Sequence, residues 1–381
     1  MKILGIETSC DETAAAVVEG RSDKIVVLSN IVSSQIEIHK KYGGVVPEVA
    51  AREHVLNMLP VVNEALEKAE ISPESFIKGG KKNIDAIAVN VGPGLITSLL
   101  VGTETAKTLA YSWNIPIIAM NHIESHIYAN WLRPISEVKS QKSKVKSHVK
   151  FPAIILTVSG GHTMLVLMKD FGKFKTIGET RDDAAGEAFD KAAQLMGVGY
   201  PGGPVIAKVA SQWKLQITNY NNQKKSKIQN SNFIIGINLP RPMINDKSYD
   251  FSFSGLKTAL LYAIKKDLYW KKRIPEYANE FQQAIVDVLV AKTIRAAKEF
   301  KVKTVMLSGG VSANKELRKQ MEQAVKNKLD KVEFSIPELK YCTDNAAMTA
   351  VAGYFRASVS RRKKKFTPWQ KIKVDCNLEL K

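Results

Sequence analysis

Short apolar runs, separated by polar or glycine-rich turns, divide the chain into alternating strands and helices. Near the N-terminus, Lys2–Thr8 and Ala14–Val18 are apolar enough to form two buried strands. The polar segment between them, Ser9–Thr13, is expected to form the turn of a hairpin. That turn places the carboxylates of Asp11 and Glu12 at the tip of the hairpin.

The same strand–turn–strand pattern recurs in the middle of the chain. Ile154–Thr157 and Met164–Met168 are apolar, and the turn between them reads VSGGHT, so that Ser159 matches Ser9 in register. Two unrelated hairpins are the alternative, because short hairpins are common. The polar, glycine-rich turns favour instead a duplicated unit and two related lobes. Backbone N–H groups at such turns can bind phosphate.

Strands followed by helices occupy much of the remaining chain. Ile84–Val91 is predicted to be a strand before a helix over Leu95–Trp113, and Thr304–Leu307 a strand before a helix over Ala313–Lys328. In the second pair Gly309 and Gly310 separate strand from helix, a geometry suited to binding an anion at the helix N-terminus. Further predicted elements are a helix from Pro47 through Leu66, a helix opening at residues 182–190, a strand and turn over Asp250–Lys257, and helices over Phe281–Phe300 and Ala346–Tyr354.

Two histidines follow a short apolar run, Ile115–Met120, that reads as a buried strand. His122 and His126 are four residues apart, so on a helix they share one face and can bind one ion. The zinc-protease motif differs, since it places its glutamate directly after the first histidine, whereas Glu124 lies two residues after His122 and points away. The alternative is two polar histidines on a surface helix.

A third ligand has to come from elsewhere in the chain. Asp344 stands at a strand-to-helix junction in the segment YCTDN and is the candidate. The alternative for Asp344 is an N-cap of the following helix, a position that Asp often occupies.

Composition and charge limit the classes of protein to which this chain can belong. The chain has 381 residues, 45% of them hydrophobic, and a formal net charge of +19 that comes mostly from Lys. This charge fits nucleic-acid binding and equally a Lys-rich codon bias. The cysteines, Cys10, Cys342 and Cys376, form no C-x-x-C pair, which fits a reducing cytosol. With no apolar run long enough to span a membrane and no signal sequence expected, we predict a cytoplasmic protein. Two Lys-rich stretches, 136–150 and 219–232, are expected to be surface insertions.

Ten motifs then occur in one order along the chain. They read LGIETSCDET, YGGVVPE, GPGL, HIESH, TVSGGHT, DDAAGEAFDKAA, YPGGP, DFSFSGLKT, SGGVSANKEL and CTDNAAM. Over Met1 to about Tyr354, the chain resembles the TsaD family of tRNA adenosine threonylcarbamoyltransferases, in its bacterial form. The resemblance implies an α/β protein with the actin-like, sugar-kinase-like ATPase fold, in which two ribonuclease-H-like lobes enclose a nucleotide cleft. Residues 1–121 would form the first lobe, with 345–381 packing back on it, and 122–344 the second.

The resemblance also implies the site residues. A divalent metal, Fe(II) in the first place and Zn(II) as the alternative, is expected on His122, His126 and Asp344. Asp11 and Glu12 fall on the acidic turn of the family. Substrate contacts are expected from Thr157, Val158, Ser159, Gly160, Gly161, Asp190, Gly203 and Asn314.

The implied reaction moves a threonylcarbamoyl group from threonylcarbamoyl-AMP to tRNA. A TsaB-type paralogue and a small TsaE-type ATPase are the expected protein partners. Sugar or acetate kinases share the fold but do not need the histidine pair, and the non-catalytic scaffold paralogue lacks it. The chain departs from the bacterial pattern at Asn121 and Ser125, where His and Gly are usual, so the entry to the histidine helix is expected to differ.

Overall fold

The computed structural model describes the chain except for residues 22–23, 73–75, 77–82, 133–148, 225–235 and 364–365. Most of the first Lys-rich stretch and residues 225–232 of the second therefore lie outside the described residues. The remainder of the second stretch, to Lys224, belongs to a helix.

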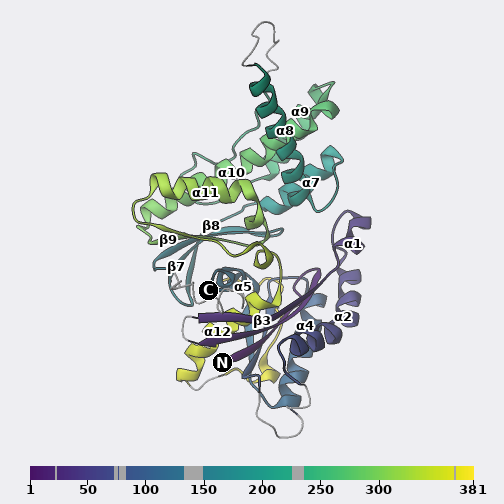
Figure 1. Ribbon diagram of the computed structural model, residues 1–381, viewed down its shortest axis with the longest axis vertical. Helices are drawn as coiled ribbons and strands as arrows, with labels where there is room; N and C mark the ends of the chain where they lie inside the picture. The colour runs from purple at the N-terminus through teal and green to yellow at the C-terminus, as the bar shows by residue number, and fades with distance from the viewer. Residues whose placement is uncertain (22–23, 73–75, 77–82, 133–148, 225–235, 364–365) are drawn as a thin grey trace.

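Two five-stranded sheets of identical topology form the framework (Figure 1). In each, three consecutive antiparallel strands are followed by two strands parallel to the first of the three. The first sheet has the order β3-β2-β1-β4-β5, and the second has the order β8-β7-β6-β9-β10. This repeated topology confirms the two-lobed α/β fold expected from the paired hairpins. The strands are β1 Lys2–Glu7, β2 Glu12–Arg21, β3 Lys24–Ser34, β4 Ala86–Gly92, β5 Ile117–Asn121, β6 Ala153–Val158, β7 Thr163–Asp170, β8 Lys173–Glu179, β9 Thr304–Ser308 and β10 Glu333–Ser335.

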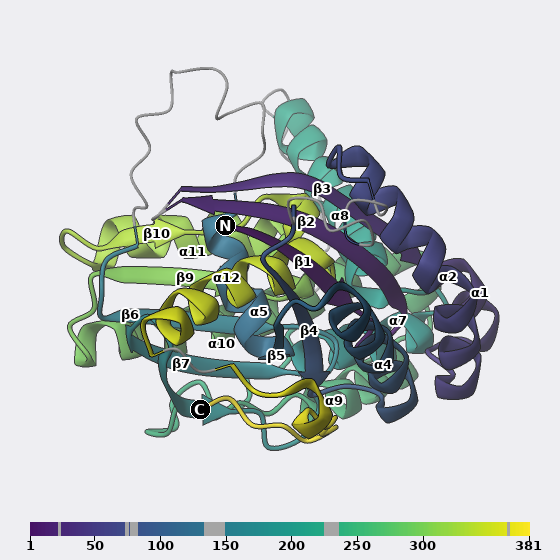
Figure 2. The same cartoon turned by 90° about the horizontal axis from the view of Figure 1, so that it is seen from below.

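Helices form three layers around the two sheets. The outer face of the first sheet packs against α2 (Pro47–Lys68) and α4 (Ile96–Trp113). Between the sheets lie α5 (His122–Tyr128) and α12 (Ala346–Lys363), whose apolar residues share one core with both sheets. The outer face of the second sheet packs against α10 (Ile274–Glu299) and α11 (Lys315–Lys328). Three further helices, α7 (Ala185–Met196), α8 (Gly202–Lys224) and α9 (Ser254–Lys266), pack against α10 and one another in the same apolar core. Figure 2 shows α5 and α12 between the two sheets.

The sequence analysis did not predict the strands β3, β8 and β10, and it predicted one strand, at Asp250, that the structure does not form. β3 alternates buried and half-exposed residues, and β8 and β10 are largely polar, so none forms the apolar run that marks a buried strand. The predicted strand at the start of Asp250–Lys257 is wrong, because Phe251 makes only an isolated bridge to Thr180. Helix α10 begins at Ile274, before the predicted start at Phe281.

Candidate functional site

The histidine helix α5 is buried along its whole length. It starts directly after β5, and Asn121 caps it by accepting hydrogen bonds from the backbone N–H groups of Ile123 (2.8 Å) and Glu124 (3.2 Å). His122 is 7% exposed and His126 is 1% exposed, because α5 lies in the layer between the two sheets. Two polar histidines on a surface helix are therefore the wrong interpretation.

His122, His126 and Asp344 come together at one point between the lobes. One ligand atom from each lies within 4.8 Å of the others. Asp344 Oδ1 is 3.0 Å from Nε2 of His126 and 3.6 Å from Nε2 of His122. Asp344 is not the cap of α12, since Asn345 accepts the hydrogen bond from the backbone N–H of Met348. Its carboxylate is therefore directed to the two imidazoles.

The donor set fits a divalent cation. Nδ1 of His126 is buried and makes no hydrogen bond, a costly state for a polar atom. Nε2 of His126 is also buried and faces the carboxylate of Asp344 at 3.0 Å. Two imidazoles and a carboxylate provide three ligands and leave coordination positions open for a substrate oxygen. The rings of His122 and His126 lie nearly perpendicular, with centroids 4.6 Å apart. The geometry therefore defines a candidate metal-binding group.

Behind His122 lies a buried carboxylate that sequence reasoning missed. Glu7, which is fully buried, has Oε2 3.3 Å from Nδ1 of His122, and Ser9 Oγ is 3.1 Å from the same nitrogen. Burial opposes a charge on the ring, but the carboxylates of Asp344 and Glu7 together raise the pKa of His122 to about 9. Asn90 donates to Glu7 and accepts a 2.8 Å hydrogen bond from Ser125, the second residue that departs from the bacterial pattern. The only sequence signal for this arrangement is a glutamate at the end of an apolar strand.

Glu124, in contrast, takes no part in the metal-binding group. Its carboxylate is 4% exposed and pairs with Arg356 of α12, which also donates to the backbone carbonyl of Ala119 (2.7 Å). The prediction that Glu124 points away from the ion agrees with this pairing, which ties α5 to α12.

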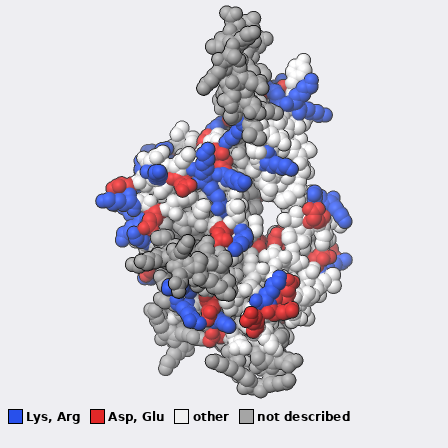
Figure 3. Space-filling model, viewed as in Figure 1, with Lys and Arg blue, Asp and Glu red and all other residues white. Residues whose placement is uncertain are grey.

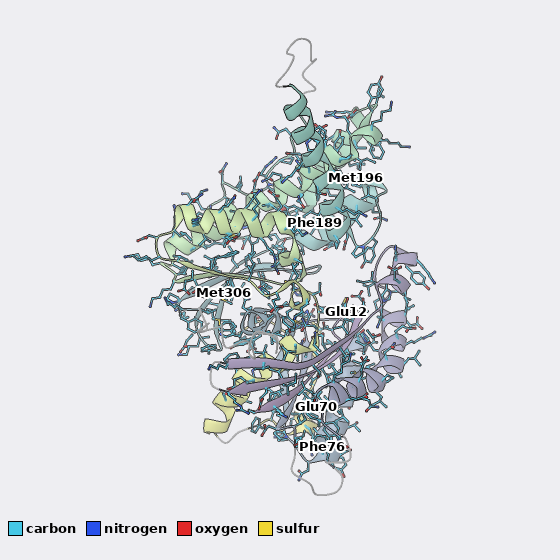
Figure 4. The ribbon with its side chains drawn as sticks, viewed as in Figure 1. Glu12, Glu70, Phe76, Phe189, Met196 and Met306 are labelled. Atoms are coloured by element: carbon cyan, nitrogen blue, oxygen red, sulfur yellow. The ribbon has the colours of Figure 1, made fainter. Side chains whose placement is uncertain are left out.

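The acidic turn of the first lobe lies on the side that faces the second lobe, as Figure 4 shows for Glu12. Burial, followed by the nearby Asp344 and Asp11 carboxylates, raises the pKa of Glu12 well above its usual range. Asp11 is buried, and its charge also raises the pKa values of Asp190 and Tyr200 in the second lobe, after the effect of burial. The tip of the first hairpin is thus close to both the histidine group and α7.

A cavity of about 340 Å³ lies on this side of the molecule, between the two lobes. It is lined by Lys40 and Gly43 of the first lobe and by Asp190, Gln194, Gly197, Gly199 and Tyr200 of the second. Asp190 Oδ1 accepts a 2.6 Å hydrogen bond from the backbone N–H of Gly202, which fixes the start of α8. Among the predicted substrate residues that the structure describes, Asp190 alone lines this cavity.

At the tip of the second hairpin, the exposed groups that a substrate could contact belong to the backbone rather than to side chains. Thr157 and Val158 are buried in β6, where Thr157 Oγ1 is 2.8 Å from Ser308 Oγ. Gly160 and Gly161 are exposed, with open space where a Cβ would lie. The backbone N–H groups of Gly186 and Glu187, at the start of α7, bind the carbonyls of Ser159 (3.2 Å) and Gly160 (3.0 Å), so the tip is held rigidly against α7.

Two further predicted substrate residues lie at helix starts. Gly203 is in the first turn of α8, again with open space at its Cβ position. Asn314 caps α11: its Oδ1 accepts from the backbone N–H groups of Glu316 and Leu317, and its Nδ2 donates to Gln282. The oxygen of the Asn314 amide and one of its two Nδ2 hydrogens are therefore used within the protein.

The two-lobed fold, with a histidine and aspartate group where the lobes meet, defines an actin-like ATPase-fold protein carrying a candidate metal centre. Among solved structures, HypF of T. kodakarensis shares the fold, with a TM-score of 0.56 and 13% identity over 95% of this chain. Full-length HypF in a phosphate- and nucleotide-bound form gives a TM-score of 0.53 and 12% identity over 94%. The chain spans about half the length of these HypF chains, 47% and 46%.

Sequence comparison identifies the family. The family described as "TsaD: tRNA N6-adenosine threonylcarbamoyltransferase" matches residues 26–351. A tRNA N6-adenosine threonylcarbamoyltransferase of Dehalococcoides mccartyi is 48% identical over 93% of this chain and 94% of its own length. The Geobacillus kaustophilus protein of that name is 47% identical, over 92% and 90%. The chain belongs to the TsaD family, as the ten ordered motifs predict.

Proposed function

We propose that this protein transfers the threonylcarbamoyl group of threonylcarbamoyl-AMP to the exocyclic amine of the adenosine adjacent to the anticodon, in tRNAs that read ANN codons. The products are threonylcarbamoyladenosine and AMP. The observation that carries the proposal is the His122, His126 and Asp344 group, present in a chain nearly half identical to threonylcarbamoyltransferases over almost its whole length.

In this reaction the protein has to position the two substrates and stabilise the charge that develops during acyl transfer. The exocyclic amine is a weak nucleophile, because its lone pair is delocalised into the purine ring, and the acyl group arrives already activated as a mixed anhydride. A divalent ion on His122, His126 and Asp344 would supply Lewis acidity for an oxygen that gains charge. Glu7 holds the imidazole of His122 by its Nδ1 and leaves Nε2 free to bind the ion. Fe(II) is the proposed native ion, with Zn(II) as the alternative, since both accept imidazole and carboxylate ligands.

The remaining site residues are proposed to bind the adenylate and move protons. The exposed backbone at Ser159–Gly161 allows close approach of a phosphate, and Asp190 lines the cavity across from Lys40. Asp11 and Glu12 are proposed as the catalytic carboxylates. The carboxylate of Glu12 would accept the proton that the attacking amine loses as the new bond to the acyl carbon forms and AMP leaves, and a raised pKa makes this carboxylate a stronger base.

The proposed macromolecular substrate is tRNA. The net charge of +19 favours a polyanion, and Figure 3 shows Lys and Arg on both lobes, with Asp and Glu among them. The candidate Lys clusters are residues 139–150, 224–227 and 361–365, of which 139–148, 225–227 and 364–365 lie outside the described residues. Within the described residues, no helix is both long and apolar enough to cross a bilayer, and a cytoplasmic location is proposed.

An apolar face of the first lobe is the proposed site for the TsaB-type paralogue. Val55, Leu56 and Leu59 on α2 are 64%, 68% and 59% exposed, and Ile96 and Leu100 on the neighbouring α4 are 45% and 42% exposed. A continuous exposed apolar face of this kind is typical of a protein interface. A TsaE-type ATPase is proposed as the further partner.

Complementation tests the proposal. The chain is expressed in a strain that lacks its own transferase, and tRNA nucleosides are analysed by mass spectrometry. Threonylcarbamoyladenosine should return with the unaltered chain and stay absent with His122→Ala. If both chains fail while both are folded and abundant, the proposed activity is wrong. If both restore the nucleoside, the metal-binding role of His122 is wrong.

A further inference from the structure

The chain beyond α12 lies across both lobes rather than ending at the surface. The family match stops at residue 351, so this segment lies outside it. Residues 369–380, here called the C-terminal strap, begin with the ring of Trp369 against the ring of Tyr111 on α4, at 5.6 Å. Ile372 is 3% exposed and belongs to the core between α2, α4 and the first sheet.

The strap is next bound to the loop after β4. The backbone N–H of Asp375 donates to the carbonyl of Val91 (2.8 Å), and that of Gly94 donates to the carbonyl of Cys376 (3.3 Å). Gly92 makes room for this path, because a Cβ there would lie 1.8 Å from the carbonyl oxygen of Asp375. The path of the strap is therefore fixed by backbone hydrogen bonds and by the absence of a side chain at Gly92.

Asn121 connects the strap to the histidine helix. Its Oδ1 caps α5, as described above, while its Nδ2 donates to the carbonyls of Leu378 (3.0 Å) and Glu379 (3.1 Å). Asn121 is 5% exposed, so water competes poorly for either end of the amide. The residue that follows is His122. One buried side chain thus joins the strap to the first turn of the helix that carries both histidines.

The end of the strap reaches the second lobe. Leu378, Glu379 and Leu380 line a cavity of about 590 Å³ whose other walls include Ile123 of α5 and His162. Ile123 directly follows His122, so this cavity lies beside the first turn of α5. The strap therefore contacts α4 and Asn121 at the start of α5, and its end faces β7 and β8 across this cavity.

We propose that the C-terminal strap is a positioning element of the metal centre, which acts through Asn121 to fix the first turn of α5 and the placement of His122. The inference rests on the proposed metal-binding role of His122. A ligand's orientation depends on what holds its backbone as well as its ring, and a loosened support lowers metal affinity without removing a ligand. Because Asn121 binds the strap through two backbone carbonyls, the presence of residues 378 and 379 matters more at this contact than the identity of their side chains.

Variants of the whole protein can separate a positioning role of the strap from a general effect on stability. Removing residues 378–381 deletes both carbonyls that Asn121 binds, and removing Lys381 alone is the matched control. Asn121→Ser keeps a capping oxygen but is too short to hold the strap. The measurements are the Co²⁺ dissociation constant with the Co²⁺ absorption spectrum, and hydrogen exchange of the α5 amides without metal.

Removal of residues 378–381 should raise the Co²⁺ dissociation constant roughly tenfold and speed amide exchange in 122–128, while deletion of Lys381 changes neither. Combining the truncation with Asn121→Ser should add little to either single change, because both break one connection. Wild-type affinity, spectrum and exchange in the truncated chain would overturn the proposal. If the unaltered chain binds no Co²⁺, the proposed metal centre is wrong, and exchange in α5 alone decides whether the strap positions this helix.

Discussion

The carboxylate of Glu7 lies 3.3 Å from Nδ1 of His122, at the bottom of the site and closed off from solvent. It also accepts a 2.6 Å hydrogen bond from the backbone N–H of Ser9 and bonds from Asn90 and Thr349. A metal-bound histidine usually has such a partner on its other nitrogen, which fixes the ring and raises its basicity.

Glu7→Gln should therefore weaken metal binding by about 10- to 100-fold while all three ligands remain. The amide keeps the shape of the carboxylate but loses its charge and one acceptor. Metal titration of the purified protein measures the change. Glu64→Gln, an exposed carboxylate on α2 that pairs with Lys68, is the control and should bind metal as the unaltered chain does.

Replacing Asp344 or His126 of the metal-binding group should abolish metal binding. Asp344→Asn keeps the side-chain volume but removes the negative ligand, and His126→Ala removes the buried imidazole. Both should lose bound metal and transfer activity, with circular dichroism unchanged. Asp330→Asn, at an exposed loop position, provides the comparison. Full metal content in either Asp344→Asn or His126→Ala would exclude that residue as a ligand.

The acidic turn should affect turnover more than binding. Glu12→Gln is expected to lower the single-turnover rate at saturating adenylate by about a hundredfold or more, the range for loss of a general acid–base group. Asp11→Asn should act in the same direction, and adenylate affinity should change little. Glu19→Gln, near the other end of β2, tests for a general effect of altering this strand. An unchanged rate in both Glu12→Gln and Asp11→Asn argues for a purely structural turn.

The apolar face of α2 and α4 gives a prediction for partner binding. Leu56→Glu places a charge at the centre of this face and should weaken binding of the TsaB-type paralogue at least about tenfold. The melting temperature should stay the same, because Leu56 is already 68% exposed. Leu268→Glu changes a residue that is 92% exposed on the other lobe and should bind normally. Calorimetric titration distinguishes the two variants.

Asp182 gives a prediction for stability against pH. Its carboxylate accepts hydrogen bonds from both the backbone and the hydroxyl of Ser254, from the hydroxyl of Ser252 and from the backbone N–H of Phe253. Burial alone would raise the pKa of Asp182, but these bonds lower it. A lowered pKa contributes stability that is fully present above about pH 4 and is lost as the pH falls through the folded-state value.

Asp182→Asn should accordingly destabilise the second lobe by about 1 kcal/mol at neutral pH. Its unfolding free energy should converge with that of the unaltered chain below about pH 4. Urea unfolding at a series of pH values measures both curves, with Asp330→Asn as the reference. A constant difference across this range would show that the charge of Asp182 does not contribute.

How much the sequence alone revealed depends on where each contact lies along the chain. His122 and His126 could be recognised because helical spacing places them on one face. Asp344 is far away in sequence, and only its junction position and the family motifs pointed to it. Glu7 went unnoticed because its neighbours in β1 read as an apolar strand, and a pattern of burial does not reveal a buried charge.

The polar strands and the C-terminal strap were even more difficult to predict from the sequence. β3 has one face that is only partly covered, so its residues do not form a continuous apolar run. The strap binds Asn121 through backbone carbonyls, which every residue type possesses, so this contact leaves no sequence motif. Asn121 was noticed as a departure from the family pattern, but its contact to Leu378 and Glu379 required the fold.

The metal-binding group lies where the chain passes between the two lobes. The chain leaves the first sheet at Asn121 and runs through His122 and His126 toward β6. It returns from β10 through Asp344 into α12, which packs back on the first sheet. An ion bound to all three residues would join the outgoing and returning passages at one point and so form part of the hinge between the lobes. Removing it should widen the range of angles between the lobes, which small-angle scattering with and without chelator can detect. Metal loss would then open the cleft as well as stop the chemistry.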